Sequence, residues 1–202
     1  LGAAGVLILW LGWFGFNGGS VLSADPTLTS LTLVTTCLAA ASGGVSAAFF
    51  ANILYKNYDL TMFMNGILGG LVGITAGADQ MSPTDSILIG LIAGVVVVLG
   101  ISLIEKLKLD DPVGAVAVHL ICGIWGTLAV GIFGELAGFD QFLIQLAGVG
   151  IIGVFCVISS FFLLFIVKAL YGLRVSKEDE LKGLDLSEHS MEAYADFRLN
   201  QL

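Results

Sequence analysis

Apolar residues are gathered in six runs along the chain, and polar residues are mostly confined to the connections between them. The runs are Leu1–Leu22, Leu31–Leu54, Met62–Ala78, Ser86–Ile104, Val113–Phe133 and Leu143–Tyr171. A helix needs about 20 apolar residues to cross a bilayer, and most of the runs are close to that length. The pattern therefore predicts an all-α integral membrane protein with six transmembrane helices, of which the third is short or interrupted.

The character of the chain changes after Tyr171, where the sequence becomes polar and acidic. We expect residues 1–171 to form the transmembrane region and residues 172–202 to form a cytoplasmic C-terminal tail. The composition agrees with a membrane protein, because 57% of the residues are hydrophobic and only 12% are charged. Soluble domains carry about twice that share of charged residues.

The charges are distributed unevenly between the two sides that six spans would define. The basic residues all belong to one side and are Lys56, Lys106, Lys108, Lys168, Arg174, Lys177, Lys182 and Arg198. The opposite connections carry Asp25, Asp79, Asp85, Glu135 and Asp140 without a Lys or Arg. The positive-inside rule makes the basic side cytoplasmic, so both ends of this chain are expected there. Acidic outer loops would concentrate cations at an outer mouth, although ordinary charge bias in membrane proteins is an alternative.

His119 is the only histidine inside an apolar run, in the segment DDPVGAVAVHLICGIWGT at Asp110–Thr127. Asp111 and Pro112 are typical of a helix N-cap and first turn. His119 would then lie roughly 10 Å below the start of that helix, within the hydrocarbon layer. A titratable group at such depth usually faces a bundle interior or a pathway, which makes it a functional candidate. The alternative is a core histidine that is hydrogen-bonded to a neighbouring helix.

The sequence does not favour metal binding or catalysis. His119 and Cys122 are one helical turn apart, but two ligands are too few for a metal site. Cys37, Cys122 and Cys156 all lie in apolar runs, which argues against a disulfide framework. No paired His/Asp, Ser/Lys or multi-ligand motif is present, so we expect a protein that is not an enzyme and has no cofactor or metal.

The first run carries two different faces if it is helical. Leu9, Trp13, Phe16 and Ser20 are spaced four, three and four residues apart, so they share one stripe. Such a stripe could line a narrow apolar passage with one polar contact near its outer end, or it could face lipid or pack in a core. The glycines at positions 12, 15 and 19 lie along another face, where a neighbouring helix could approach closely.

Three motifs resemble the ammonium transporter (Amt/MEP/Rh) family. They are GWFGFNGGS at Gly12–Ser20, DDPVGAVAVHLICGIWGT at Asp110–Thr127 and GLRVSKEDELKGLDLSEHS at Gly172–Ser190. The resemblance implies a fold of eleven transmembrane helices built from two inverted five-helix repeats, in which the six helices here match helices six to eleven. It also implies that the first five helices are absent from this sequence, and that the assembly is a homotrimer with one pore in each subunit.

The same resemblance assigns roles to individual residues. His119 resembles one of two pore histidines, and Phe16 resembles one of two stacked phenylalanines that gate the external end of the pore. Trp13 and Leu9 resemble pore-lining residues, and Ser20 resembles the hydroxyl that helps to bind ammonium in the outer vestibule. The other pore histidine and the other gate phenylalanine belong to the absent helices.

The function implied by the resemblance is transport of ammonium or ammonia across the plasma membrane. Ammonium would be recruited at the outer vestibule and deprotonated, and ammonia would pass through a hydrophobic pore lined by histidine. An ammonium sensor built on the same scaffold is the alternative. The implied partners are the lipid bilayer, further copies of the chain and a PII-type signalling protein at the cytoplasmic face, with no role for nucleic acid.

Overall fold

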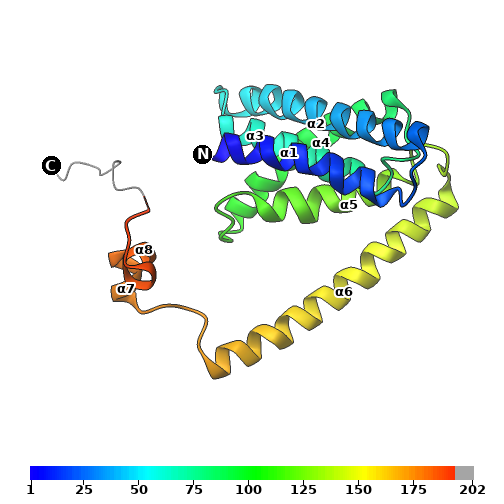
Figure 1. The fold of residues 1–202 in the computed structure, drawn as a ribbon. Helices are drawn as coiled ribbons and strands as arrows, with labels where there is room; N and C mark the ends of the chain where they lie inside the picture. The colour runs from blue at the N-terminus through cyan, green and yellow to red at the C-terminus, as the bar shows by residue number, and fades with distance from the viewer. Residues whose placement is uncertain (194–202) are drawn as a thin grey trace. The chain divides into compact units, whose positions relative to one another are not determined.

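The computed structural model describes residues 1–193, so the predicted cytoplasmic Arg198 lies outside the described residues. Every regular element among residues 1–193 is helical (Figure 1). The helices are α1 (Gly2–Ser20), α2 (Pro26–Tyr55), α3 (Leu60–Thr75), α4 (Pro83–Lys106), η1 (Val116–Ile121), α5 (Cys122–Ala129), α6 (Phe139–Leu170), α7 (Lys177–Lys182) and α8 (Leu184–His189).

Within the described chain, four helices are long and apolar enough to cross a membrane. These are α1, α2, α4 and α6. The apolar helix α3 and the continuous pair η1–α5 are shorter. The expectation of an all-α membrane protein is confirmed, and the third helix is short as the sequence indicated. The number of six spans stays a prediction.

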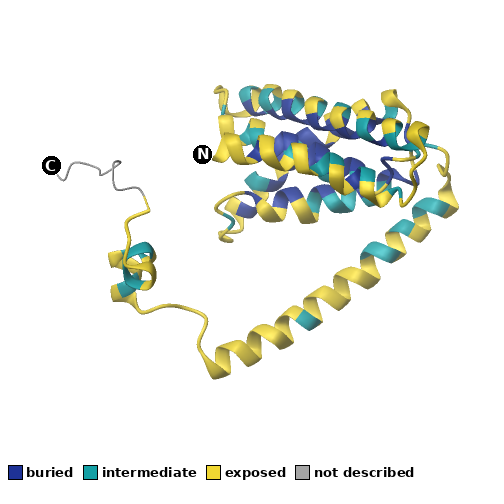
Figure 2. Cartoon of the chain, in the orientation of Figure 1, coloured by how far each residue is buried: buried dark blue, intermediate teal, exposed yellow. Residues whose placement is uncertain are grey.

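Residues 1–151 and residues 152–202 form two compact units, which are described separately. In the first unit α2, α3 and α4 pack against one another in pairs. Helix α1 lies against α2 and α3, whereas η1 and α5 lie against α3 and α4. Buried residues follow the inner faces of these helices (Figure 2). Helix α3 is therefore the element to which both α1 and η1 are attached.

Small residues allow the helices of the first unit to approach closely. A Cβ atom added at Gly70 of α3 would come within 2.8 Å of the carbonyl carbon of Ala39 in α2. A Cβ atom added at Gly94 of α4 would lie 2.8 Å from the Cβ of Ser46, also in α2. Both contacts are too short for real side chains, so α2 can pack this tightly only because these positions are glycine. Close packing between small residues is how helices associate in membranes, where the hydrophobic effect offers little attraction.

Side-chain caps fix the starts of the central helices. The Asp25 carboxylate accepts hydrogen bonds from two backbone N–H groups at the start of α2, and Asp59 does the same for α3. Ser82 and Asp85 form a reciprocal capping box at the start of α4. These caps satisfy backbone donors that a helix leaves unpaired.

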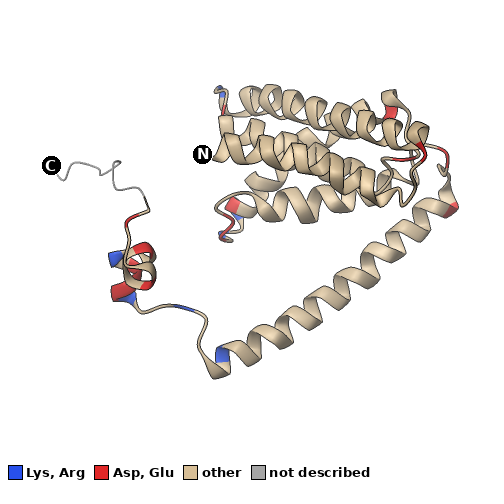
Figure 3. Cartoon of the chain, viewed as in Figure 1, with Lys and Arg blue, Asp and Glu red and all other residues tan. Residues whose placement is uncertain are grey.

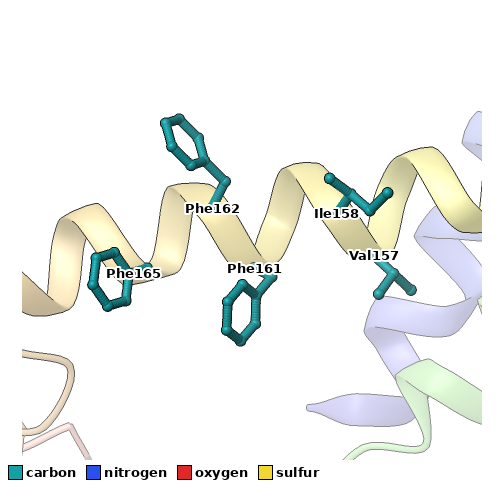
Figure 4. Close-up of a pocket in the computed structure, with 5 residues that line it drawn as sticks. All are labelled: Val157, Ile158, Phe161, Phe162 and Phe165. Atoms are coloured by element: carbon teal, nitrogen blue, oxygen red, sulfur yellow. The ribbon is translucent and has the colours of Figure 1, made fainter.

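The second unit contains the later part of α6 and the short polar helices α7 and α8. One apolar hollow of about 470 Å³ lies along α6 and is lined by Val157, Ile158, Phe161, Phe162 and Phe165 (Figure 4). All five residues come from one helix and none carries a polar side-chain atom, so the hollow offers no chemistry. In the polar segment that follows, Arg174 and Glu180 form an exposed ion pair at 2.6 Å.

Candidate functional site

The stripe on α1 is partly exposed and partly anchored. Leu9 is 50% exposed and Phe16 is 58% exposed, although both are large apolar side chains. Trp13 between them is half-buried, and its indole Nε1 donates a hydrogen bond to the Thr75 hydroxyl of α3 at 2.9 Å. The Trp13 and Phe16 rings meet edge to face, with centroids 5.7 Å apart. One ring of the stripe is therefore fixed by α3, and it supports the more exposed ring.

Ser20 lies at the end of α1 and is exposed. Its hydroxyl donates a hydrogen bond to the Phe16 carbonyl at 2.8 Å. Because the proton is used within the helix, the oxygen lone pairs remain available to accept hydrogen bonds from a ligand. This arrangement suits a ligand that donates a hydrogen bond.

His119 lies in the π-helical segment η1 and is exposed in the first unit. The adjacent Ala117 and Val118 are buried, so the histidine marks the outward face of the segment. Residues 1–193 provide no hydrogen-bond partner for the imidazole. Among residues 1–193 no neighbouring helix bonds the imidazole, and the choice between a pathway histidine and a core histidine stays a prediction. π-helical turns are rare and are frequent at functional sites.

Asp111 caps the helix that carries His119, but the helix begins later than the sequence indicated. Pro112 and Val113 form a turn, and the Asp111 carboxylate accepts hydrogen bonds from the N–H groups of Ala115 at 2.7 Å and Val116 at 2.9 Å. The left-handed conformation of Gly114, with φ of 75°, makes this longer turn possible. Asp111 therefore helps to position His119 through the first turn of η1.

The stripe and the histidine lie on separate helices. Helices α1 and η1 both pack against α3, and within the described residues they do not pack against each other. Cys122 is buried and its thiol donates to the Ala93 carbonyl, so it does not share the exposed surroundings of His119. The glycine face of α1 has no neighbour within 4 Å of positions 12, 15 and 19 in the described structure. Among the described residues, no helix makes the expected close contact there.

Two polar residues that organise this region were not predicted from the sequence. Neither Thr75 nor Asn17 was predicted as a functional residue. The Thr75 hydroxyl accepts the hydrogen bond from Trp13, and Asn17 is buried and donates to Thr36. A polar amide within an apolar run, one turn after Trp13, is the signal that could have revealed Asn17. The π-helical form of η1 had no visible signal in the sequence.

The long apolar helices define an α-helical membrane protein. Comparison with known proteins identifies its class. Residues 2–194 match the Ammonium Transporter Family. The chain is 38% identical to ammonium transporter Amt2 of Archaeoglobus fulgidus over 96% of its own length and 45% of that protein. It is 40% identical to ammonium transporter Amt2 of Methanocaldococcus jannaschii over 94% of its length and 45% of that protein.

Comparison with solved structures gives the same family. A sensor Amt protein superposes with a TM-score of 0.88 at 37% identity, over 92% of this chain and 48% of that one. This chain belongs to the ammonium transporter family. It spans less than half the length of the relatives and of the solved structure it matches.

Proposed function

We propose that the protein containing this chain conducts ammonium or ammonia across the plasma membrane. The observation that supports this most strongly is the pairing of an anchored aromatic stripe on α1 with an exposed, unpartnered histidine on η1, both carried by α3. Membership of the ammonium transporter family indicates that the substrate is ammonium or ammonia. We assign the pore-lining roles to His119, Phe16, Trp13 and Leu9, and the outer ammonium contact to Ser20.

The chemistry of these side chains suits ammonium. A bare ion that enters apolar protein faces a large desolvation cost. Aromatic faces such as Phe16 and Trp13 can stabilise the ion by about 0.5–2 kcal/mol each, and the Ser20 oxygen can accept a hydrogen bond from the ion. The ion then releases a proton, and ammonia passes the apolar stretch with His119 as a hydrogen-bonding partner. One ring nitrogen of an imidazole can accept a proton while the other donates one, so the side chain can also relay the proton. Potassium has no proton to release, which gives selectivity.

The residues proposed to line the pore need further helices opposite them to close it. Leu9, Phe16 and His119 are apolar or titratable groups on an uncovered surface. We infer that helices resembling an inverted first repeat cover this face and supply the second pore histidine. The six helices alone are therefore expected to conduct nothing.

The charges support one orientation. Figure 3 shows that the ends of the first unit differ, with lysines at one end and acidic residues alone at the other among residues 1–151. We place the end with Lys56, Lys106 and Lys108 in the cytoplasm, together with the tail. Labelling with a membrane-impermeant maleimide tests this in cysteine-free protein. Ser23→Cys should react from outside intact cells and Ser190→Cys should not, and the reverse result would refute the orientation.

Methylammonium uptake by liposomes that contain the full-length protein tests the transport proposal. His119 makes no hydrogen bond among residues 1–193, so we expect His119→Ala to give folded protein with strongly altered uptake. His189→Ala is the matched control, because it removes the other histidine from the polar helix α8. Absence of uptake by the unaltered protein, or equal uptake by both variants and the parent, would refute the proposal.

A sensor is the second candidate, because the solved structure of a sensor Amt protein is closely similar to this one. A sensor would bind ammonium on the same residues and signal through the tail instead of conducting. Ammonium binding without flux in the liposome assay would favour this function. The homotrimer and the PII-type partner remain proposals drawn from the family. Sedimentation of the purified full-length protein, alone and with a PII protein, would test both.

A further inference from the structure

The one π-helical turn among the described residues carries His119. Across this turn the backbone N–H of Cys122 donates a hydrogen bond to the carbonyl of Ala117, five residues earlier. An α-helix makes the same kind of bond over four residues. The turn therefore contains one residue more than an α-helix would hold, a feature that is rare and often marks functional sites.

The burial of three residues shows what the extra residue changes. An α-helix rotates by about 100° per residue, so in an α-helix His119 would lie within about 60° of Cys122 around the axis, and Ala117 would lie about 140° away from it. In the structure Ala117 and Cys122 are both fully buried, whereas His119 is exposed. The wide turn thus brings Ala117 to the packed face of the helix and turns His119 away from that face.

Helix α5, which follows the turn, is fixed against rotation by two hydrogen bonds to α4. The Cys122 thiol donates to the Ala93 carbonyl at 3.6 Å, and the Trp125 indole Nε1 donates to the Ile89 carbonyl at 3.1 Å. Both pairs span about one helical turn, so the two bonds lie along one side of α5. Because α5 is held in this way, the direction of His119 is set by the shape of the turn that precedes it.

Gly100 of α4 provides the space against which the wide turn packs. A Cβ atom added at Gly100 would lie 3.2 Å from the Cβ of Ala117 and 2.8 Å from the Cδ1 of Ile121. Both distances are shorter than ordinary contacts, so a side chain at this position would push the turn away from α4. The start of the turn is held separately by the Asp111 carboxylate, which accepts two backbone hydrogen bonds there.

We propose that the extra residue of the π-helical turn orients His119 toward the pore, and that Gly100 and Cys122 are positioning residues that maintain this turn. The effect on transport rests on the proposed function of His119, whereas the geometry of the turn does not. Removal of one residue between Ala117 and Cys122 should restore an α-helix and turn the imidazole about the helix axis.

Deletion of Leu120 from the full-length protein tests this proposal. Leu120 is exposed, and its loss would place Ala117 and Val118 four and three residues before Cys122. Residues at these spacings share one face of an α-helix, so the buried residues stay buried and the unfolding temperature should remain close to that of the parent. Methylammonium uptake should fall by about tenfold or more, which is within the range that a displacement of about 1 Å causes.

Leu120→Ala is the matched control, because it removes the same side chain and keeps the number of residues in the turn. Its uptake should stay close to that of the parent. Equal uptake by the deletion variant and the parent, or equal losses in the deletion variant and Leu120→Ala, would overturn the positioning role.

Gly100→Ala replaces the deletion if the deletion variant does not fold. Gly123→Ala is then the control, because the nearest atom to its added Cβ lies at an ordinary 3.8 Å. Gly100→Ala should lower uptake more strongly than Gly123→Ala, and equal uptake by these two variants would overturn the proposal.

Crystal structures of the full-length parent and the deletion variant give a readout that does not depend on uptake. The parent should keep the five-residue turn from Ala117 to Cys122. The variant should close the same bond over four residues, with His119 turned about the axis. A four-residue turn in the parent, or an unchanged direction of His119 in the variant, would overturn the geometry. Absence of uptake by the parent would refute transport and the role of the turn in it, whereas the crystal structures would still decide what orients His119.

Discussion

The indole Nε1 of Trp13 donates a hydrogen bond to the Thr75 hydroxyl, and this 2.9 Å contact ties the aromatic stripe of α1 to the end of α3. Thr75 in turn donates to the Leu71 carbonyl, so the acceptor is held by its own helix. The orientation of the Trp13 ring, and of the Phe16 ring that meets its edge, is therefore set by α3. The candidate pore face depends on a contact between residues 62 positions apart.

Trp13→Phe should lower uptake and stability, because it removes the donor and leaves the Thr75 oxygen without this partner. A hydrogen bond of this kind contributes about 0.5–1.5 kcal/mol. Thermal unfolding and methylammonium uptake of the full-length protein measure the two effects. Trp10→Phe is the control, because the Trp10 indole nitrogen is buried without a partner in the described structure. An equal loss in both variants would show that the hydrogen bond does not matter.

Asp111→Ala should destabilise the start of η1 and reduce uptake through His119. The substitution leaves the N–H groups of Ala115 and Val116 without their carboxylate acceptor. Loss of an N-terminal cap costs about 0.5–2 kcal/mol. Asp110→Ala removes the neighbouring charge, which makes no cap, and should leave both properties nearly unchanged. Unfolding midpoints and uptake rates of the two variants test this prediction. A larger effect of Asp110→Ala would contradict the role of Asp111 at the start of η1.

Much of the architecture could be predicted from the sequence because it depends on local pattern. The apolar runs predicted the helices, whereas the expected N-cap at Asp111 was wrong in position: the N-cap of η1 is Ala115, and the Asp111 carboxylate accepts from the Ala115 N–H from outside the helix. The later start of that helix could not be predicted, because it depends on the left-handed Gly114 beside Asn65 of α3. The sequence also could not predict that the Asn17 side-chain oxygen has no hydrogen-bond partner among the described residues, because this depends on how α1 packs against α2. Tertiary contacts decide such details, and a single sequence does not display them.

Gly70→Ala should destabilise the first unit strongly. The added methyl group would meet the backbone of Ala39, which cannot move aside as a flexible side chain could. Overpacking of this kind typically costs about 1–3 kcal/mol. Gly123→Ala is the matched control, since its nearest neighbour would be the Val72 side chain at an ordinary 3.8 Å. Alanine is also a better helix former than glycine, so the control should be neutral or slightly stabilising. Unfolding of the full-length protein in detergent compares the two, and equal midpoints would refute the tight α2–α3 contact.

The tail should lose a local contact in acid. The Asp185 carboxylate accepts a hydrogen bond from the Ala193 N–H at 3.0 Å, and this bond is the main reason that the pKa of Asp185 is lowered. Desolvation is the second-largest effect and opposes this shift, while further backbone N–H groups and the nearby His189 lower the pKa. Because the folded pKa lies below the ordinary value of about 3.9, the contact is fully present above that pH. It is lost as the pH drops through the lowered pKa.

Hydrogen exchange of the Ala193 amide measures this directly. The amide should be protected at pH 6, and the protection, corrected for the intrinsic exchange rate, should disappear in acid below the pKa of Asp185. Asp185→Ala should abolish protection at every pH, whereas Glu188→Gln removes a neighbouring charge of α8 and should preserve it. Protection that persists in Asp185→Ala would show that another group holds the amide. A carboxylate accepts this hydrogen bond better than the protonated acid does, so protonation should weaken the contact. Protection of the Ala193 amide that increases in acid would therefore contradict the lowered pKa of Asp185.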